Sequence, residues 1–145
     1  MKAISIKQPW ATMIMLSGKD VENRDWHTNY KGTIAIHASK DVSITEYQQA
    51  RLKETRITGK PSLTPSQCPV GVIIGVVDIV GCLRNSSSPW FVGKYGFLLE
   101  NPIMLPNPIP CKGALSFWEI HRDVEANIQE QLKGIYGKSN LQGNL

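Results

Sequence analysis

The chain has 145 residues, of which 41% are hydrophobic and 19% are charged. This composition is typical of one globular domain with a single core, and it excludes an intrinsically disordered chain. The net charge of +4 favours a polyanionic partner such as a nucleic acid, because each phosphate that binds a Lys or Arg releases condensed counterions. The three cysteines lie far apart, which indicates neither a disulfide framework nor a zinc site.

Neither a membrane protein nor a secreted protein is expected. The first ten residues, MKAISIKQPW, contain no long apolar stretch of the kind that a signal peptide needs. The longest apolar run, residues 70–81, is interrupted by Gly75 and Asp78 and is too short to span a bilayer. We therefore expect a cytoplasmic protein without membrane contact.

The N-terminal part predicts a strand followed by a short helix. Residues 2–6 alternate apolar and polar side chains as a strand does, and residues 8–18 have the pattern of a helix with Pro9 in its first turn and Gly18 at its end. Trp10 lies at the start of this helix, where its indole either packs into the core or walls a pocket.

A group of charged residues follows this helix. If residues 21–26 are extended, Glu22, Arg24 and Trp26 point to one face, and the residues between them point to the other. Lys19 precedes Glu22 by three positions. This arrangement is the first indication of a site.

The middle of the chain predicts a strand, a helix and a second strand. Residues 33–39 alternate as a strand that carries His37 and Ser39 on one face, and residues 43–59 predict a helix with a Ser or Thr cap and a terminal glycine. Residues 70–83 are rich in Val and Ile with glycines spaced among them, which favours a strongly bent central strand.

The C-terminal part predicts two strands and a helix. The strands are residues 95–105 and 113–120, and three prolines in residues 106–112 oppose regular pairing between them. Residues 122–137 have a helical period, and residues 139–145 are expected to form a flexible tail.

These elements predict a single domain over residues 1–138 of the α+β class. Five or six strands and two or three helices in mixed order fit a small mixed β-barrel, closed or partly closed, with helices on its outside. A parallel α/β sheet would need a regular alternation of strands and helices, which the second half lacks.

The common catalytic motifs are absent from the chain. It contains no GxGxxG, GxxxxGK[ST], HExxH or GxSxG, so neither a cofactor nor a metal is predicted. His37 is the histidine best placed for a site, because Ser39 shares its strand face. The pair would suit a base and a nucleophile, and the alternative is a structural or surface histidine.

Lys19, Glu22 and Arg24 carry the more promising chemistry. A lysine beside a carboxylate and a second cation can act as a base or hold a phosphate. The alternative is an ion-pair cluster on the surface. Lys112 is a further cation that a barrel would bring close.

The stretch SIKQPWATMIMLSGKDVENRDWHTNYKGTIAIHAS, residues 5–39, resembles the ASCH domain, a member of the PUA-like β-barrel superfamily. The family signature is GxKxxExR. Lys19, Glu22 and Arg24 match it, whereas Ser17 stands in place of its first glycine and Gly18 follows. We refer to Lys19, Glu22 and Arg24 as the signature triad.

The resemblance continues in residues 95–120, where Tyr95, Lys112 and Gly113 stand at places characteristic of the family. It implies a PUA-like barrel with a cleft lined by the signature triad, and a role in RNA or nucleotide chemistry. Some members have been assigned ribonuclease activity. A short bacterial branch hydrolyses acetylated cytidine with a Lys, Thr and Glu set, and Glu22 stands here in place of that threonine.

The first functional hypothesis is a binding module for single-stranded RNA or a nucleotide. Arg24, Lys19 and Lys112 would meet phosphates or base acceptors, and the ring of Trp10, Trp26 or Tyr95 would stack on a base. The expected ligand-binding residues are Arg24, Trp10, Trp26, His37, Ser39, Tyr95, Lys112 and Gly113.

Two further hypotheses remain open. One is a metal-independent hydrolase, either a ribonuclease or an amidohydrolase that acts on an acylated nucleoside, with Lys19 or Glu22 as the base and the neighbouring cations stabilising charge. The other is a regulatory interaction module without catalysis, because a fold does not determine a function.

Overall fold

The computed structural model describes residues 1–143, with side chains for residues 1–137. Within these residues it contains six strands, three α-helices and a short 3₁₀ helix. In chain order they are β1 (Lys2–Ile6), α1 (Trp10–Leu16), β2 (Val21–Arg24), β3 (Gly32–Ala38), α2 (Ile44–Thr58), η1 (Pro65–Gln67), β4 (Val72–Leu83), β5 (Tyr95–Pro110), β6 (Phe117–Glu119) and α3 (Arg122–Gly143). The predicted tail at residues 139–145 lies outside the residues whose side chains are described, and it stays a prediction.

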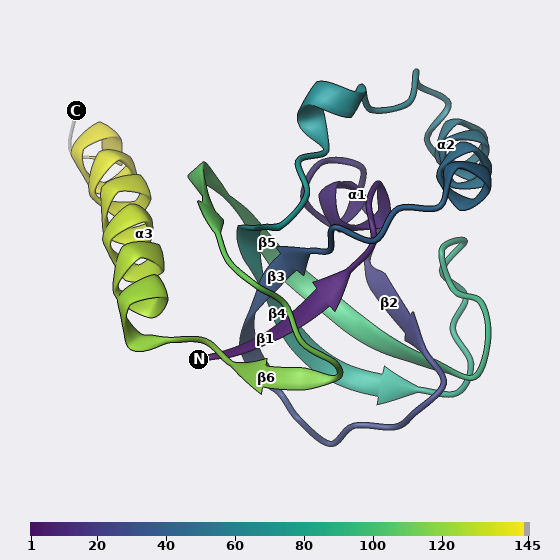
Figure 1. The fold of residues 1–145 in the computed structure, drawn as a ribbon, viewed down its shortest axis with the longest axis horizontal. Helices are drawn as coiled ribbons and strands as arrows, with labels where there is room; N and C mark the ends of the chain where they lie inside the picture. Colours follow the sequence, from purple (N-terminus) through teal and green to yellow (C-terminus); the bar gives the residue numbers. More distant parts are fainter. Residues whose placement is uncertain (144–145) are drawn as a thin grey trace.

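The described strands form one mixed sheet in the order β2-β5-β4-β3-β1-β6. Only β1 and β3 pair in parallel, and the other neighbours are antiparallel. The sheet curls into a half-barrel, with α1 above it and α2 and α3 on opposite sides of the molecule (Figure 1). The prediction of an α+β fold built on a small mixed barrel-like sheet is therefore confirmed.

Glycines allow the central strand β4 to bend. Its pairing with β5 changes register between Ile73 and Gly75 and again between Ile79 and Gly81. Bulges of this kind increase the local bend and twist of a strand. At Gly75 a Cβ would lie 2.5 Å from the carbonyl oxygen of Ile103, so no other residue fits there.

The sequence indicated that the prolines after residue 105 would end the strand, but β5 continues through them to Pro110. Ile73 of β4 pairs with Ile109, whereas Gly75 pairs with Met104, so β5 has more residues than β4 in this interval. Pro106 and Pro108 fall in that irregular stretch, where β4 requires no regular ladder hydrogen bond from their nitrogens. The last predicted strand, residues 113–120, shortens to β6.

The helix boundaries follow from their capping residues. Ser43 accepts a hydrogen bond from the backbone N–H of Glu46 at 3.4 Å, and Gly59 ends α2 in the left-handed conformation. The caps predicted for α2 are therefore confirmed. Gly18, just beyond α1, has a φ of +73°, a conformation that glycine adopts without strain.

The buried apolar residues form three clusters, one beside each helix. The cluster that contains Phe97 lies between the sheet and α1, and the cluster that contains Ile128 lies between the sheet and α3. The cluster that contains Ala50 joins α2 to α1. No helix in the described part of the chain is long and apolar enough to cross a membrane.

Candidate functional site

A cleft of about 1550 Å³ opens beside the signature triad. Its walls come from β1, α1, β2, the end of β3, α2 and the segment of residues 110–116. Eight of the residues expected at the site line it: Trp10, Lys19, Glu22, Arg24, His37, Ser39, Lys112 and Gly113. Trp26 and Tyr95 do not.

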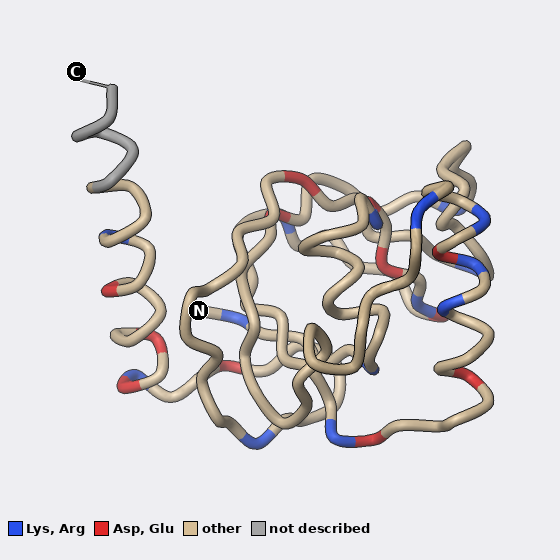
Figure 2. The backbone as a smooth tube through the Cα atoms, turned by 90° about the horizontal axis from the view of Figure 1, so that it is seen from above, with Lys and Arg blue, Asp and Glu red and all other residues tan. Residues whose placement is uncertain are grey.

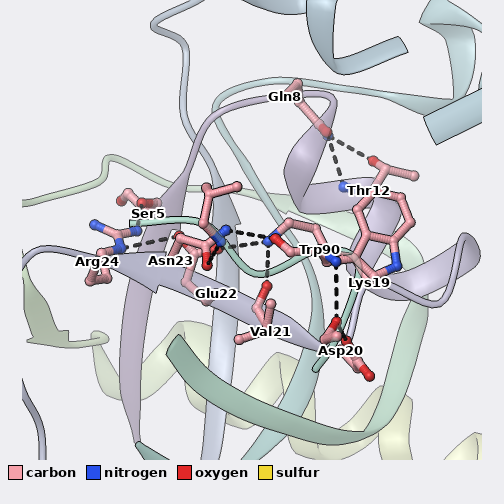
Figure 3. A network of polar contacts seen from close by, with 12 residues as sticks. Ser5, Gln8, Thr12, Lys19, Asp20, Val21, Glu22, Asn23, Arg24 and Trp90 are labelled. Atoms are coloured by element: carbon pink, nitrogen blue, oxygen red, sulfur yellow. Dashed lines mark hydrogen bonds and ion pairs between the residues drawn. The ribbon is translucent and has the colours of Figure 1, made fainter. Parts of the chain in front are cut away.

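The signature triad forms a connected group of ion pairs at the base of this cleft (Figure 3). Lys19 donates from Nζ to Oε2 of Glu22 at 3.4 Å and to the backbone carbonyl of Val21. Arg24 donates from Nε to the other carboxylate oxygen of Glu22, Oε1, at 3.1 Å. Lys19 and Glu22 are buried and Arg24 is partly exposed, so Arg24 is the most accessible side chain of the triad.

The local sequence places these side chains together. After α1 ends, the chain turns at Gly18, and the backbone N–H of Lys19 donates to the carbonyl oxygen of Met13 at 3.2 Å. Strand β2 then puts Glu22 and Arg24 on the same face, as its alternation requires. The prediction of one strand face is therefore confirmed for Glu22 and Arg24, whereas Trp26 lies beyond the end of β2 and does not line the cleft.

Trp10 forms an aromatic wall of the cleft, with two lysines near its ring. The Nζ atoms of Lys19 and Lys53 lie 5.8 Å and 5.9 Å from the centroid of its ring, within the range of cation–π attraction. Burial lowers the pKa of Lys53 below its ordinary value, and the nearby charges of Lys19 and Arg56 lower it further. A bound anion would relieve this repulsion.

His37 pairs with Ser5, which the sequence did not single out. Its Nε2 lies 2.7 Å from the carbonyl oxygen of Cys111 and its Nδ1 lies 3.0 Å from Oγ of Ser5. A carbonyl only accepts, so in the neutral ring Nε2 carries the proton and the Ser5 hydroxyl donates to Nδ1. Burial lowers the pKa of His37, which favours this neutral form.

Gly113 covers this pair with its backbone alone. A Cβ at Gly113 would lie 2.5 Å from Oγ of Ser5 and 2.7 Å from Nδ1 of His37. The hypothesis of a Ser39–His37 pair is replaced, because the ring bonds to Ser5 and Cys111 while Ser39 accepts from the backbone N–H of Asp41 at 3.1 Å.

The two aromatic residues outside the cleft have other neighbours. Trp26 packs edge-on against Phe97 and Phe117, with ring centroids 5.1 Å and 5.3 Å apart. The guanidinium of Arg84 lies 5.6 Å from the ring centroid of Tyr95. Binding by Trp26 or Tyr95 therefore stays a prediction, and Trp10 is the one of the three that the cleft exposes.

The cations of the cleft wall differ in their partners. Lys7 lies 3.3 Å from Glu46 and 3.8 Å from Asp41. Three others form no ion pair with any carboxylate of the described residues: Lys40, Lys53 and Lys112. Both signs of charge are mixed along α2, which contributes to the cleft, and along α3, which does not (Figure 2). Attraction for an anion is therefore expected at the cleft and not over a whole face.

Sequence reasoning also missed Asn23 and Lys53. Asn23 donates from Nδ2 to the carbonyl of Trp90 at 3.0 Å and accepts from the N–H of Val92 at 3.0 Å, which ties the loop before β5 to β2. Lys53 is one of many charged residues on α2, and its spacing does not distinguish it from the others, so only the packing of α2 beside Trp10 reveals it.

The sequence profile of the ASCH domain matches residues 4–105, which is more than half of the chain. The chain belongs to the ASCH domain family. It is 27% identical over 150 residues to the human protein named Activating signal cointegrator 1, and 27% identical over 145 residues to its mouse counterpart. Each alignment covers 91% of this chain and 25% of the relative, so the chain spans about a quarter of their length.

The fold of this ASCH domain has a counterpart among solved structures. The crystal structure of ASCH from Zymomonas mobilis superposes with a TM-score of 0.52 and 15% sequence identity, and the match covers 92% of this chain and 93% of that one. At this identity the likeness concerns the fold. It agrees with the curled sheet and three helices described above.

Proposed function

We propose that this ASCH domain binds single-stranded RNA, or a nucleotide portion of it, in the cleft beside the signature triad. The observation that carries the proposal is that the Trp10 ring shares one cleft with Arg24 and with the three lysines that form no ion pair with any carboxylate of the described residues. Base stacking on an aromatic ring combined with a positively charged groove is the usual means of binding single strands.

The size of the cleft supports a strand as the ligand. Sites for drug-sized molecules have volumes of about 300–1,000 Å³, whereas this cleft measures about 1550 Å³. A single nucleotide would leave part of it unoccupied. Two or more linked nucleotides would allow a phosphate to meet Lys112 while a base stacks on Trp10.

The signature triad is held together by its own contacts. One oxygen of Glu22 accepts from Lys19 and the other from Arg24, and the buried Lys19 also donates to the carbonyl oxygen of Val21. Each carboxylate oxygen keeps a second lone pair, so Glu22 remains the candidate base of the hydrolase hypothesis, and a product assay decides between binding and hydrolysis.

The test is a binding titration with a fluorescein-labelled 12-nucleotide RNA in EDTA, followed by fluorescence anisotropy over a series of salt concentrations. We expect affinity to fall steeply with salt, and Trp10→Ala to weaken binding by about 1–3 kcal/mol. Lys112→Ala should reduce the slope of log affinity against log salt by about 0.7, the value for one phosphate on a single strand.

The matched control is Lys94→Ala, because Lys94 is exposed and lies outside the cleft. Absence of binding at low salt, or equal effects of Lys94→Ala and Lys112→Ala, would overturn the proposal. The same incubation analysed by mass, with an acylated nucleoside included, tests the hydrolase hypothesis: product that disappears in Lys19→Met would establish catalysis instead.

A further inference from the structure

Glu54 is a buried carboxylate that the proposed function does not use. It lies on α2 with 2% of its surface exposed, and it forms no ion pair with any cation of the described residues. Burial of a carboxylate is costly unless hydrogen bonds replace its water. Ser17 donates from Oγ to Oε2 at 2.6 Å, and the backbone N–H of Leu63 donates to Oε1 at 2.9 Å.

The first of these donors belongs to the segment that carries the signature. Ser17 is the C-cap of α1 and precedes Lys19 by two residues. It occupies the position at which the family signature has its first glycine, so this hydroxyl is a departure of this chain from the pattern. Through it, the buried carboxylate of Glu54 fastens α2 to the turn before Lys19.

The other contacts of α2 include the packing of Ala50 and Ile57 in the third core cluster and an exposed ion pair from Glu46 to Lys7. Only Ala50 and Glu54 are buried among its residues. Lys53, the neighbour of Glu54 in the chain, lines the cleft with Nζ 5.9 Å from the ring centroid of Trp10. A shift of α2 would therefore move Lys53 away from the aromatic wall.

We propose that the Ser17–Glu54 hydrogen bond positions Lys53 at the cleft, where its ammonium contacts a phosphate of the bound strand. Ser17 and Glu54 are positioning residues, since neither needs to touch the ligand. The phosphate contact rests on the proposed function, whereas the placement of Lys53 beside Trp10 is a property of the free protein. The two parts can therefore be tested separately.

The first experiment compares salt slopes for the labelled 12-nucleotide RNA among Ser17→Ala, Lys53→Ala and the double variant. We expect each single variant to lower the slope by about 0.7, and the double variant to lower it no further, because the same phosphate contact is lost. Ser17→Thr, which keeps the hydroxyl, should behave as the wild type. A variant that only destabilises the fold would weaken binding but would leave the slope of log affinity against log salt unchanged.

The second experiment needs no nucleic acid. The indole ¹H–¹⁵N resonance of Trp10, assigned with Trp10→Phe, should shift in Ser17→Ala and in Lys53→Ala but not in Ser17→Thr. If Ser17→Ala does not fold, because it leaves the Glu54 carboxylate buried without this donor, Ser17→Ala combined with Glu54→Gln serves in its place. The double change removes the hydroxyl and the buried charge and keeps an acceptor for Leu63.

The outcomes separate the two parts. An unchanged Trp10 resonance in Ser17→Ala overturns the positioning role. A Lys53→Ala slope equal to that of the wild type overturns the phosphate contact. Additive slopes in the double variant overturn the positioning role, because Lys53 would then keep its phosphate contact in Ser17→Ala. If the wild-type protein binds no RNA, the proposed function and the phosphate contact both fail, and the Trp10 resonance still decides whether Ser17 positions Lys53.

Discussion

Arg24 of β2 donates a hydrogen bond from Nη2 to the carbonyl oxygen of Ser5 in β1 at 2.9 Å, although three strands separate β2 from β1 in the sheet. The curl of the sheet makes this contact possible. The same guanidinium donates from Nε to Glu22. One side chain therefore joins two distant strands and orders the base of the cleft, and its geometry should matter for the fold as well as for binding.

Arg24→Lys tests this double role, because lysine keeps the charge but lacks the planar fork that reaches both partners. Hydrogen bonds to charged groups contribute about 1.5–3 kcal/mol each. We expect the free energy of unfolding to fall by about that amount, measured by urea denaturation. Lys94→Ala, which removes an exposed cation, should change it by less than about 0.5 kcal/mol. Equal stability of wild type and Arg24→Lys would mean that the Ser5 contact contributes nothing.

Gly113→Ala tests the packing over Ser5 and His37. The added Cβ would lie 2.5 Å from Oγ of Ser5 and 2.7 Å from the His37 ring, and both partners are fixed by strand pairing. We expect the free energy of unfolding to fall by about 1–3 kcal/mol, measured by urea denaturation.

The control for this substitution is Gly134→Ala on α3, where a Cβ meets nothing within 4 Å. That change should raise the free energy of unfolding by up to about 1 kcal/mol, because alanine favours a helix. The packing argument for Gly113 does not survive if the two substitutions have the same sign.

The grouping of the three side chains of the signature triad could be predicted from the sequence, because these residues lie in one turn and one short strand. Alternation places Glu22 and Arg24 on the same face without any knowledge of the rest of the fold. The same rule failed to bring Trp26 into the cleft, because β2 ends at Arg24 and the chain then bends, so that Trp26 packs on Phe97.

Contacts between distant segments could not be predicted in this way. Ser5 and His37 meet because β1 and β3 pair in parallel with these two residues opposite each other. Nothing in the spacing of either strand specifies that register, so Ser39, two residues away, looked like the natural partner. Lys53 was missed for a related reason, because its place in the cleft depends on how α2 packs beside Trp10.

Because His37 is buried, we expect the free energy of unfolding to fall in mild acid. Burial lowers its pKa below the ordinary value of 6.5 in the folded protein, so below pH 6.5 the unfolded chain binds more protons than the folded one. Stability should therefore be complete above pH 6.5 and should fall as the pH decreases toward the folded pKa. Urea denaturation between pH 5 and pH 8 measures this dependence.

The comparison variant is His37→Gln, whose stability should depend less on pH over this range even if its absolute value is lower. His121→Gln controls for the other histidines, because that side chain is 68% exposed. An identical pH dependence for His37→Gln and the wild type would show that another group is responsible.

Because the pKa of Lys53 is lowered, we expect the affinity for RNA to fall in mild alkali. Burial first, and then the charges of Lys19 and Arg56, hold its pKa below the ordinary value of 10.5 in the free protein. A bound phosphate favours the ammonium form and raises that pKa, so binding takes up a proton wherever the free lysine is neutral. The affinity should consequently fall as the pH rises through the pKa of the free protein.

A 2′-O-methyl oligoadenylate is a suitable probe for this measurement, since its backbone is stable in alkali. Lys53→Arg should make the decline between pH 7.5 and pH 10 smaller than in the wild type, because a guanidinium stays charged throughout. Lys133→Arg, on an exposed part of α3, should keep the wild-type decline. If Lys53→Arg loses affinity with pH as the wild type does, the titrating group lies elsewhere in the cleft, and Lys53 does not contact the phosphate.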